Sequence, residues 1–201
     1  MTAASFLALG DSYTIGEGVA PAERWPAQLA ALLTARGVPV AEPQVIARTG
    51  WTTDELAAGI AAATQQGTFD LVSLLIGVNN QYRGRPLDEY QDEFGALLTT
   101  AAWFAGEKVS RLLVLSIPDW GVTPFAAGRD AVQIAREIDA FNAAAHRIVT
   151  ARGARWVDIT GISRERHDGW LAADGLHMSA RQYAAWAAAA LDAARAALST
   201  R

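Results

Sequence analysis

Short apolar runs alternate along the chain with longer segments of helical periodicity. The apolar runs are rich in leucine and β-branched residues, which is typical of strands buried on both faces of a parallel sheet. The expected strands are 6–9, 44–47, 71–76, 112–117 and 156–159. The expected helices are 24–36, 53–66, 87–105, 130–152 and 179–198.

Local signals support the expected helix boundaries. Thr52 with Glu55, and Ser179 with Gln182, have the spacing of a capping box at a helix start. Strands that alternate with helices predict an α/β protein, with a parallel sheet and helices on both of its faces. No repeat or low-complexity linker divides the sequence, so we expect one domain over residues 1–201.

Composition and charge narrow the classes of function. The chain has 201 residues, of which 51% are hydrophobic and 19% charged, as in an ordinary globular protein. Its formal net charge of −4 provides no basic surface for a nucleic acid, so we expect no nucleic-acid partner. The sequence has no cysteine, which excludes disulfides, thiolate chemistry and cysteine-ligated metals.

The start of the sequence bears on location. Met1 is followed within a few residues by the first apolar run, without the basic segment, apolar core and cleavage site of a signal peptide. No apolar run reaches the roughly 18 residues needed to span a bilayer. We therefore expect a cytoplasmic location for the chain as given and no stable membrane insertion. An exported form stays open if a leader has been trimmed, and the oligomeric state is not predicted.

Unusual residues follow the expected strands, where ligands of parallel sheets bind. Ser12 follows the first strand, Gly50 the second and Asn79 the third. Asp174 and His177 stand between the fifth strand and the last helix. Because the carboxyl ends of parallel strands meet at one edge of the sheet, we expect these residues to gather there.

The three side chains Ser12, His177 and Asp174 have the chemistry of a catalytic triad. A serine hydroxyl is a weak nucleophile and needs a neighbouring base. An imidazole can be that base near neutral pH, and Asp174 stands three residues before His177, where it can orient the ring. Taken singly, Ser12 could instead cap a turn, and the other two could form a surface pair.

Three hydrogen-bond donors could stabilise a tetrahedral intermediate. They are the backbone N–H groups of Ser12 and Gly50 and the side-chain amide of Asn79. Singly, Gly50 could be a turn glycine and Asn79 a capping residue. Their common order along the chain, each next to a predicted strand or helix, favours the functional interpretation.

This set of residues resembles the SGNH hydrolases, also called the GDSL lipase/esterase family. The matching blocks are Gly10-Asp11-Ser12-Tyr13, Gly50, Gly77-Val78-Asn79-Asn80 and Asp174-Gly175-Leu176-His177. The resemblance implies a flavodoxin-like three-layer α/β/α sandwich with five parallel strands in the order 2-1-3-4-5. It implies the same triad and oxyanion donors, and no metal or organic cofactor. Two positions differ from the common pattern: Asn80, where aspartate is frequent, and Met178, where proline is frequent.

Aromatic residues in the loops suggest where a substrate binds. We expect substrate contacts from Trp51, Tyr82, Trp120 and Trp170, and from Phe125 beside them, although these rings could equally cover the edge of the core. Two nearby arginines, Arg83 and Arg85, could meet an anionic group or could be solvated.

The expected function is hydrolysis of small carboxylic esters with short or medium acyl chains through an acyl-enzyme. Two alternatives stay open. The first is a carbohydrate O-deacetylase with the same triad. The second is a flavodoxin-like module in which Ser12, Tyr13, Thr14 and Gly16 bind a phosphate-bearing ligand.

Overall fold

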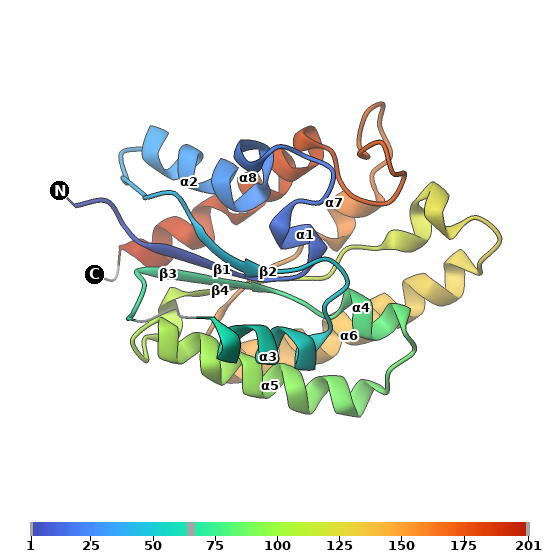
Figure 1. Cartoon of the computed structure of the whole chain (residues 1–201), viewed down its shortest axis with the longest axis horizontal. Helices are drawn as coiled ribbons and strands as arrows, with labels where there is room; N and C mark the ends of the chain where they lie inside the picture. The colour runs from blue at the N-terminus through green and yellow to red at the C-terminus, as the bar shows by residue number, and fades with distance from the viewer. Residues whose placement is uncertain (1, 64–66, 200–201) are drawn as a thin grey trace.

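Five parallel strands form one sheet with the order β2-β1-β3-β4-β5 (Figure 1). The structure is a computed structural model that describes residues 2–63 and 67–199. The strands are β1 (Phe6–Gly10), β2 (Gln44–Ala47), β3 (Leu71–Leu75), β4 (Leu112–Leu115) and β5 (Arg155–Val157). The predicted fold class and strand order are therefore confirmed.

Helices cover both faces of this sheet (Figure 1). Helices α2 and α8 pack against each other on one face, and α3, α5 and α6 cover the other. The α-helices are α1 (Ser12–Ile15), α2 (Trp25–Ala35), α3 (Thr53–Ala62), α4 (Val78–Tyr82), α5 (Leu87–Phe104), α6 (Ala131–Arg152), α7 (Thr160–Arg164) and α8 (Ala180–Leu198). Short 3-10 turns are η1 (Pro21–Glu23), η2 (Val109–Arg111), η3 (Trp120–Val122) and η4 (Pro124–Ala126).

The element boundaries differ from the expectation at several ends. The third and fourth strands end at Leu75 and Leu115, before the predicted 76 and 117, and the fifth begins at Arg155. Full burial of the strands is correct for β1, β3 and β4 but wrong for the edge strands β2 and β5, which are partly exposed. Helix α3 ends at Ala62 and Ala63 is its C-cap, so the predicted extension is wrong at residue 63, and residues 64–66 lie outside the described ones.

Short helices were not predicted by the sequence. Helices α1, α4 and α7 have only four or five residues, which is too short for a 3.6-residue period to repeat. The capping box predicted at Thr52 is confirmed, and the one predicted at Ser179 is confirmed only in part. The Thr52 N–H donates to Glu55 Oε2 at 2.9 Å, as a capping box requires. Ser179 Oγ accepts from the Gln182 N–H at 3.3 Å, but the Gln182 amide turns away to the Ile162 carbonyl.

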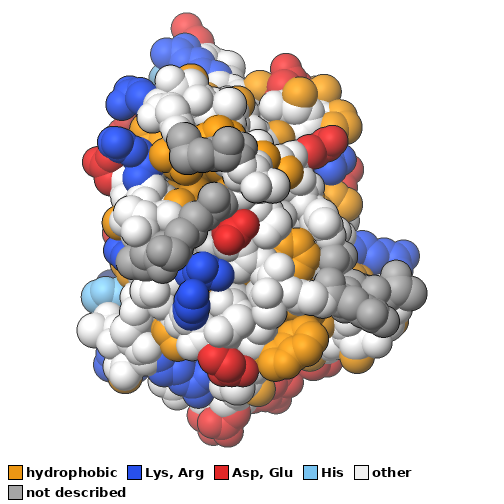
Figure 2. All heavy atoms as spheres, turned by 90° about the vertical axis from the view of Figure 1, so that its left-hand side faces the viewer, with side chains coloured by type: hydrophobic (Ala, Val, Ile, Leu, Met, Phe, Trp, Pro, Cys, Tyr) orange, Lys and Arg blue, Asp and Glu red, His pale blue; other side chains and the backbone are white. Residues whose placement is uncertain are grey.

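Surface composition agrees with the low net charge. The face in Figure 2 carries interspersed acidic and basic side chains with small apolar areas between them. Over residues 2–63 and 67–199, no helix is both long enough and apolar enough to cross a bilayer.

Gly10 ends β1 at the point where the chain turns into α1. The lack of room for a side chain explains why this residue is glycine. A Cβ atom at this position would lie 2.2 Å from Thr14 Oγ1 and 2.4 Å from the Leu75 carbonyl oxygen. The second neighbour is backbone of the adjacent strand and cannot move aside alone. The close approach of α1 to β3 therefore depends on the missing side chain.

We predict that Gly10→Ala lowers the free energy of unfolding by about 1–3 kcal/mol, because the added methyl group overpacks this junction. Thermal or urea unfolding measures the change. The matched control is Gly161→Ala in α7, where a Cβ atom would meet nothing within 4 Å. Equal stability of the two variants would contradict the account of Gly10.

Candidate active site

Ser12 lies at the first position of α1, directly after the carboxyl end of β1. Asp11 caps this helix, and its Oδ1 accepts a hydrogen bond from the Tyr13 N–H at 3.0 Å. Gly16, in a left-handed conformation with φ of 68°, ends the helix after one turn. The Ser12 side chain is almost buried, at 4% exposure, and faces a pocket.

Asp174 and His177 form a compact hydrogen-bonded unit before α8. Asp174 Oδ1 accepts from the backbone N–H groups of Leu176 and His177, both at 2.9 Å. Its Oδ2 lies 2.6 Å from His177 Nδ1. Partial burial alone would raise the pKa of Asp174, but the bonds from the imidazole and the two amides lower it below its usual value. The carboxylate is therefore ionised at neutral pH and can hold the Nδ1–H tautomer of the ring.

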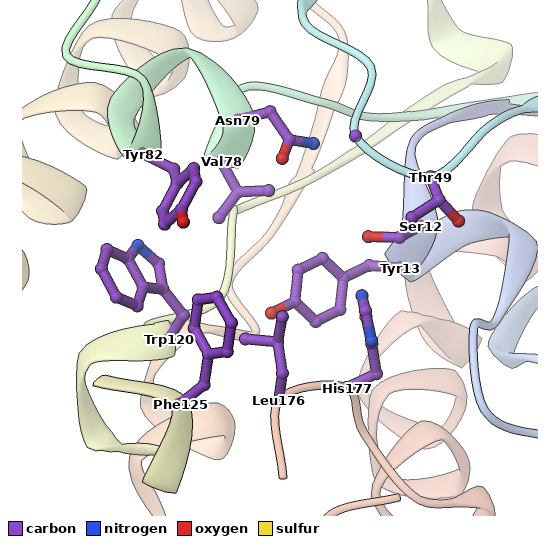
Figure 3. Close-up of a pocket in the computed structure, with 11 residues that line it drawn as sticks. Ser12, Tyr13, Thr49, Val78, Asn79, Tyr82, Trp120, Phe125, Leu176 and His177 are labelled. Atoms are coloured by element: carbon purple, nitrogen blue, oxygen red, sulfur yellow. The ribbon is translucent and has the colours of Figure 1, made fainter. Parts of the chain in front are cut away.

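The predicted residues from the two ends of the chain line one pocket of about 130 Å³ (Figure 3). Ser12 and His177 both face it, and the Tyr13 ring packs against the imidazole with centroids 5.3 Å apart. No hydrogen bond between described residues joins Ser12 Oγ to His177. In unliganded sites such bonds are often long and tighten when substrate binds.

The three predicted oxyanion donors lie around the same pocket. Gly50 and Asn79 both line it, and the Gly50 φ of 85° requires glycine. Asn79 Nδ2 donates one hydrogen to the Trp51 carbonyl at 2.9 Å, which orients the amide and leaves its second hydrogen free. Among the described residues, neither the Ser12 N–H nor the Gly50 N–H donates to a protein acceptor.

The residue after Asn79 joins the two loops that carry these donors. Asn80 is fully buried, and its Oδ1 accepts from the Thr53 N–H at 3.1 Å while its Nδ2 donates to Thr53 Oγ1 at 2.6 Å. Asparagine at this position therefore satisfies one donor and one acceptor of the same threonine. No local pattern in the sequence indicates this role, because it depends on the approach of α3 to α4.

Arg83 and Arg85 are ion-paired rather than simply solvated, and neither lines the pocket. Arg83 Nη2 donates to the Gly50 carbonyl at 2.6 Å, and its Nη1 lies 3.2 Å from Glu55. Arg85 lies 2.7 Å from Asp54. Arg83 thus supports the loop that carries Gly50.

Of the four aromatic residues predicted to contact the substrate, two line the pocket and two do not. Tyr82 and Trp120 line the pocket, together with Phe125. Trp51 does not, because its ring packs over Gly59, where a Cβ atom would come within 2.2 Å of it. Trp170 lines a neighbouring hollow instead. The remaining lining residues, which the sequence analysis did not assign to substrate contacts, are Tyr13, Thr49, Val78 and Leu176.

Other histidines and acidic groups do not extend the site. His146 is exposed on α6 and packs against Trp156, and His167 Nε2 lies 3.0 Å from Gln182 Oε1. Within the described part of the chain, no group of three or more histidine, aspartate or glutamate side chains is arranged to hold a metal ion.

A family model described as the GDSL-like lipase/acylhydrolase family matches residues 8–185. No curated protein matches the sequence. Solved structures with a similar fold include a lipase/acylhydrolase from Enterococcus faecalis (19% identity, 94% of each chain covered, TM-score 0.72). An esterase from Pseudoalteromonas sp. is similar at 17% identity (95% and 96% covered, TM-score 0.71). An acetylxylan esterase from Geobacillus stearothermophilus is similar at 19% identity (95% and 94% covered, TM-score 0.70).

A second carboxyl group, that of Asp11, lies beneath the site. It is fully buried, and its Oδ2 has no hydrogen-bond partner among the described residues. Burial raises the pKa of Asp11 to about 7, although the Tyr13 N–H partly offsets this. Its negative charge contributes, after burial, to the raised pKa of the Tyr13 and Tyr90 hydroxyl groups. Asp11 therefore carries much less charge near neutral pH than a surface aspartate.

This burial predicts a pH-dependent stability difference between the parent and Asp11→Asn. A carboxyl whose pKa rises from 3.8 to about 7 on folding stabilises the protein while protonated. Its contribution is full below pH 3.8 and is lost as the pH rises through 7. Asparagine can keep the cap without the charge, so the variant should gain on the order of 4 kcal/mol relative to the parent between pH 4 and pH 8.

Urea unfolding of both proteins at pH 4 and pH 8 measures this difference. Asp168→Asn, at an exposed position, is the control and should show no such trend. The stability difference between Asp11→Asn and the parent could instead be the same at both pH values. That result would contradict a pKa of Asp11 raised by burial.

Proposed function

This chain belongs to the GDSL-like lipase/acylhydrolase family and is an ester hydrolase, and we propose that it cleaves carboxylic esters with Ser12 as its nucleophile. The observation that carries this proposal is the shared pocket. Ser12 lines it beside His177, whose Nδ1 is held 2.6 Å from the ionised Asp174.

The proposed cycle is acyl transfer through an acyl-enzyme. His177 accepts the proton of Ser12 Oγ as that oxygen attacks the ester carbonyl, and Asp174 stabilises the imidazolium that forms. The imidazolium then gives the proton to the leaving alcohol, and the acyl group stays on Ser12. A water molecule, deprotonated by the same imidazole, releases the acid and restores the serine.

The oxyanion of each tetrahedral intermediate is proposed to bind the Ser12 and Gly50 N–H groups and the free hydrogen of the Asn79 amide. All three residues line the pocket. Preorganised donors cost no rearrangement when the charge develops, and each is typically worth about 2.7–4 kcal/mol in the transition state. The bond from Asn79 to the Trp51 carbonyl supplies that preorganisation.

The proposed substrate has a short or medium acyl chain. The leaving alcohol must lie on the His177 side, so the acyl chain extends the other way, toward Val78 and the rings of Tyr82 and Trp120 (Figure 3). These side chains make an apolar surface, and the pocket volume of about 130 Å³ is small for a ligand site.

One observation favours a carbohydrate O-deacetylase as a second candidate. Tyr82 and Phe125 line the pocket and are 40% and 43% exposed, so their flat rings can stack on a sugar. Release of acetate from acetylated xylo-oligosaccharides faster than from simple acetates would favour this candidate.

The phosphate-binding alternative is disfavoured by the N-terminus of α1. Asp11 caps this helix, and its Oδ1 already accepts from the Tyr13 N–H that a bound anion would need. Helix α1 also has only four residues, so its dipole is small.

We predict that Ser12→Ala abolishes hydrolysis of p-nitrophenyl acetate, butyrate and hexanoate, because the proposed cycle has no nucleophile without the Ser12 hydroxyl. The parent and the variant are assayed in parallel, with thermal unfolding as a check on folding. Ser163→Ala, at a buried serine away from the pocket, is the matched control and should keep its activity. Activity of a folded Ser12→Ala above one hundredth of the parent would contradict the assignment.

We predict that Asp174→Asn lowers kcat/KM about 10²–10⁴-fold, because the imidazole loses its charged partner and its fixed tautomer. Steady-state kinetics with p-nitrophenyl butyrate measure the loss, and Asp168→Asn is the control. The assignment of Asp174 would be overturned by a folded variant that turns over as fast as the parent.

A further inference from the structure

We propose that Arg129 is a specificity-determining residue that holds the aromatic end of the pocket closed around the acyl chain. This inference rests on the proposed function and adds a residue that does not line the pocket itself.

The far end of the pocket is a wall of three rings, Tyr82, Trp120 and Phe125, here called the aromatic wall (Figure 3). Tyr82 and Trp120 meet edge to face with centroids 5.2 Å apart, and Phe125 lies 6.0 Å from Tyr82 and 6.1 Å from Trp120. Tyr82 comes from α4, and the other two come from the turns η3 and η4. Two separate segments of the chain therefore meet in this wall.

Only one of the three rings is fixed from within the protein. Trp120 is 3% exposed, and its Nε1–H donates to Gln81 Oε1 at 2.7 Å, while Gln81 Nε2 donates in turn to Glu137. Tyr82 and Phe125 are 40% and 43% exposed. Each of these two rings has solvent on one side, so its position depends on what contacts it from outside.

Arg129 supplies that outside contact. Its guanidinium carbon lies 5.0 Å from the Tyr82 ring centroid, 5.2 Å from that of Trp120 and 6.0 Å from that of Phe125. Its Nη2 also donates to the Tyr82 hydroxyl at 3.2 Å. Cation–π attraction of this kind is significant within about 6 Å of a ring. One side chain thus contacts every ring of the aromatic wall.

The backbone holds Arg129 in place for this role. Its N–H donates to the Ala126 carbonyl at 2.9 Å, in the turn that follows η4. The next residue, Asp130, caps α6 by accepting from the Val132 and Gln133 N–H groups, both at 3.0 Å. No ion pair among the described residues gives Arg129 an acidic partner. Its side chain is therefore not drawn away from the rings by a carboxylate.

The consequence concerns acyl chains long enough to reach the aromatic wall. An acetyl group ends near Ser12 and the oxyanion donors, so it does not reach the rings. A hexanoyl chain extends toward Tyr82 and Trp120 and gains from rings that are already in place. Loss of Arg129 should leave the chemistry intact and weaken the selection of the longer chain.

The test compares kcat/KM for p-nitrophenyl hexanoate and acetate in the parent, Arg129→Ala and Arg129→Lys. We expect the hexanoate-to-acetate ratio to fall about two- to fivefold in Arg129→Ala, which is the size of an exposed cation–π contact. The loss should be in KM for hexanoate, with kcat for acetate unchanged. Lysine keeps the positive charge but not the planar guanidinium group. The hexanoate-to-acetate ratio of Arg129→Lys should therefore lie between those of the parent and Arg129→Ala.

Two controls separate this role from a merely structural one. Arg166→Ala removes an exposed cation that lines the same neighbouring hollow as Arg129, and it should not change the ratio. Tyr82→Phe removes the hydroxyl acceptor and keeps the ring, so it should lower the ratio less than Arg129→Ala. If Arg129→Ala is less stable on heating, Arg129→Lys and Tyr82→Phe decide the question.

A binding measurement keeps this inference distinct from the proposed catalysis. Calorimetric binding of hexanamide is compared in Ser12→Ala and in Ser12→Ala/Arg129→Ala, and we expect about two- to fivefold weaker binding in the second. A parent that cleaves no ester would overturn the catalytic proposal, and the hexanamide result would still decide the role of Arg129. An unchanged chain-length ratio together with unchanged hexanamide binding would overturn the role of Arg129.

Discussion

Burial of the Tyr13 ring between His177 and Trp186 is the interaction on which the site depends. Tyr13 follows Ser12 directly, and its ring centroid lies 5.3 Å from that of His177 and 5.9 Å from that of Trp186. Trp186 belongs to α8, which packs beside α2 on one face of the sheet. The docking of the last helix therefore sets the position of the imidazole relative to the first strand. Neither end of the chain could form the pocket alone, so any change that loosens α8 should act on the site as well as on stability.

Two carboxyl groups near this junction have opposite environments. Asp174 accepts two backbone amides and the imidazole, and these bonds lower its pKa despite partial burial. Asp11 is fully buried with one unpartnered oxygen, and its pKa is raised to about 7. When the pKa values of two neighbouring carboxyl groups are shifted in opposite directions, the two groups have different roles. Asp174 can neutralise an imidazolium, whereas a fully charged Asp11 would be costly and serves chiefly as the cap of α1.

The sequence predicted the parts of this structure that depend on local pattern. Buried strands and long amphipathic helices have clear periodicity, and a parallel sheet then places Ser12, Gly50 and Asn79 at one edge. It could not predict contacts that depend on how elements meet. Trp51 and Tyr82 look alike as loop aromatics, yet one packs over Gly59 and the other faces the pocket. The bond from Asn80 to Thr53 and the contact of Arg129 with three rings have no local signal either.

The central claim is that the Ser12 hydroxyl is activated by the imidazole of His177. Reaction with a fluorophosphonate, followed by peptide mapping in the mass spectrometer, tests it most directly, because the reagent reacts far faster with an activated serine than with an ordinary one. The account predicts one adduct per chain, located on Ser12, and no adduct in His177→Ala. An adduct on another serine, no adduct on the folded parent, or undiminished labelling of Ser12 without the imidazole would contradict it.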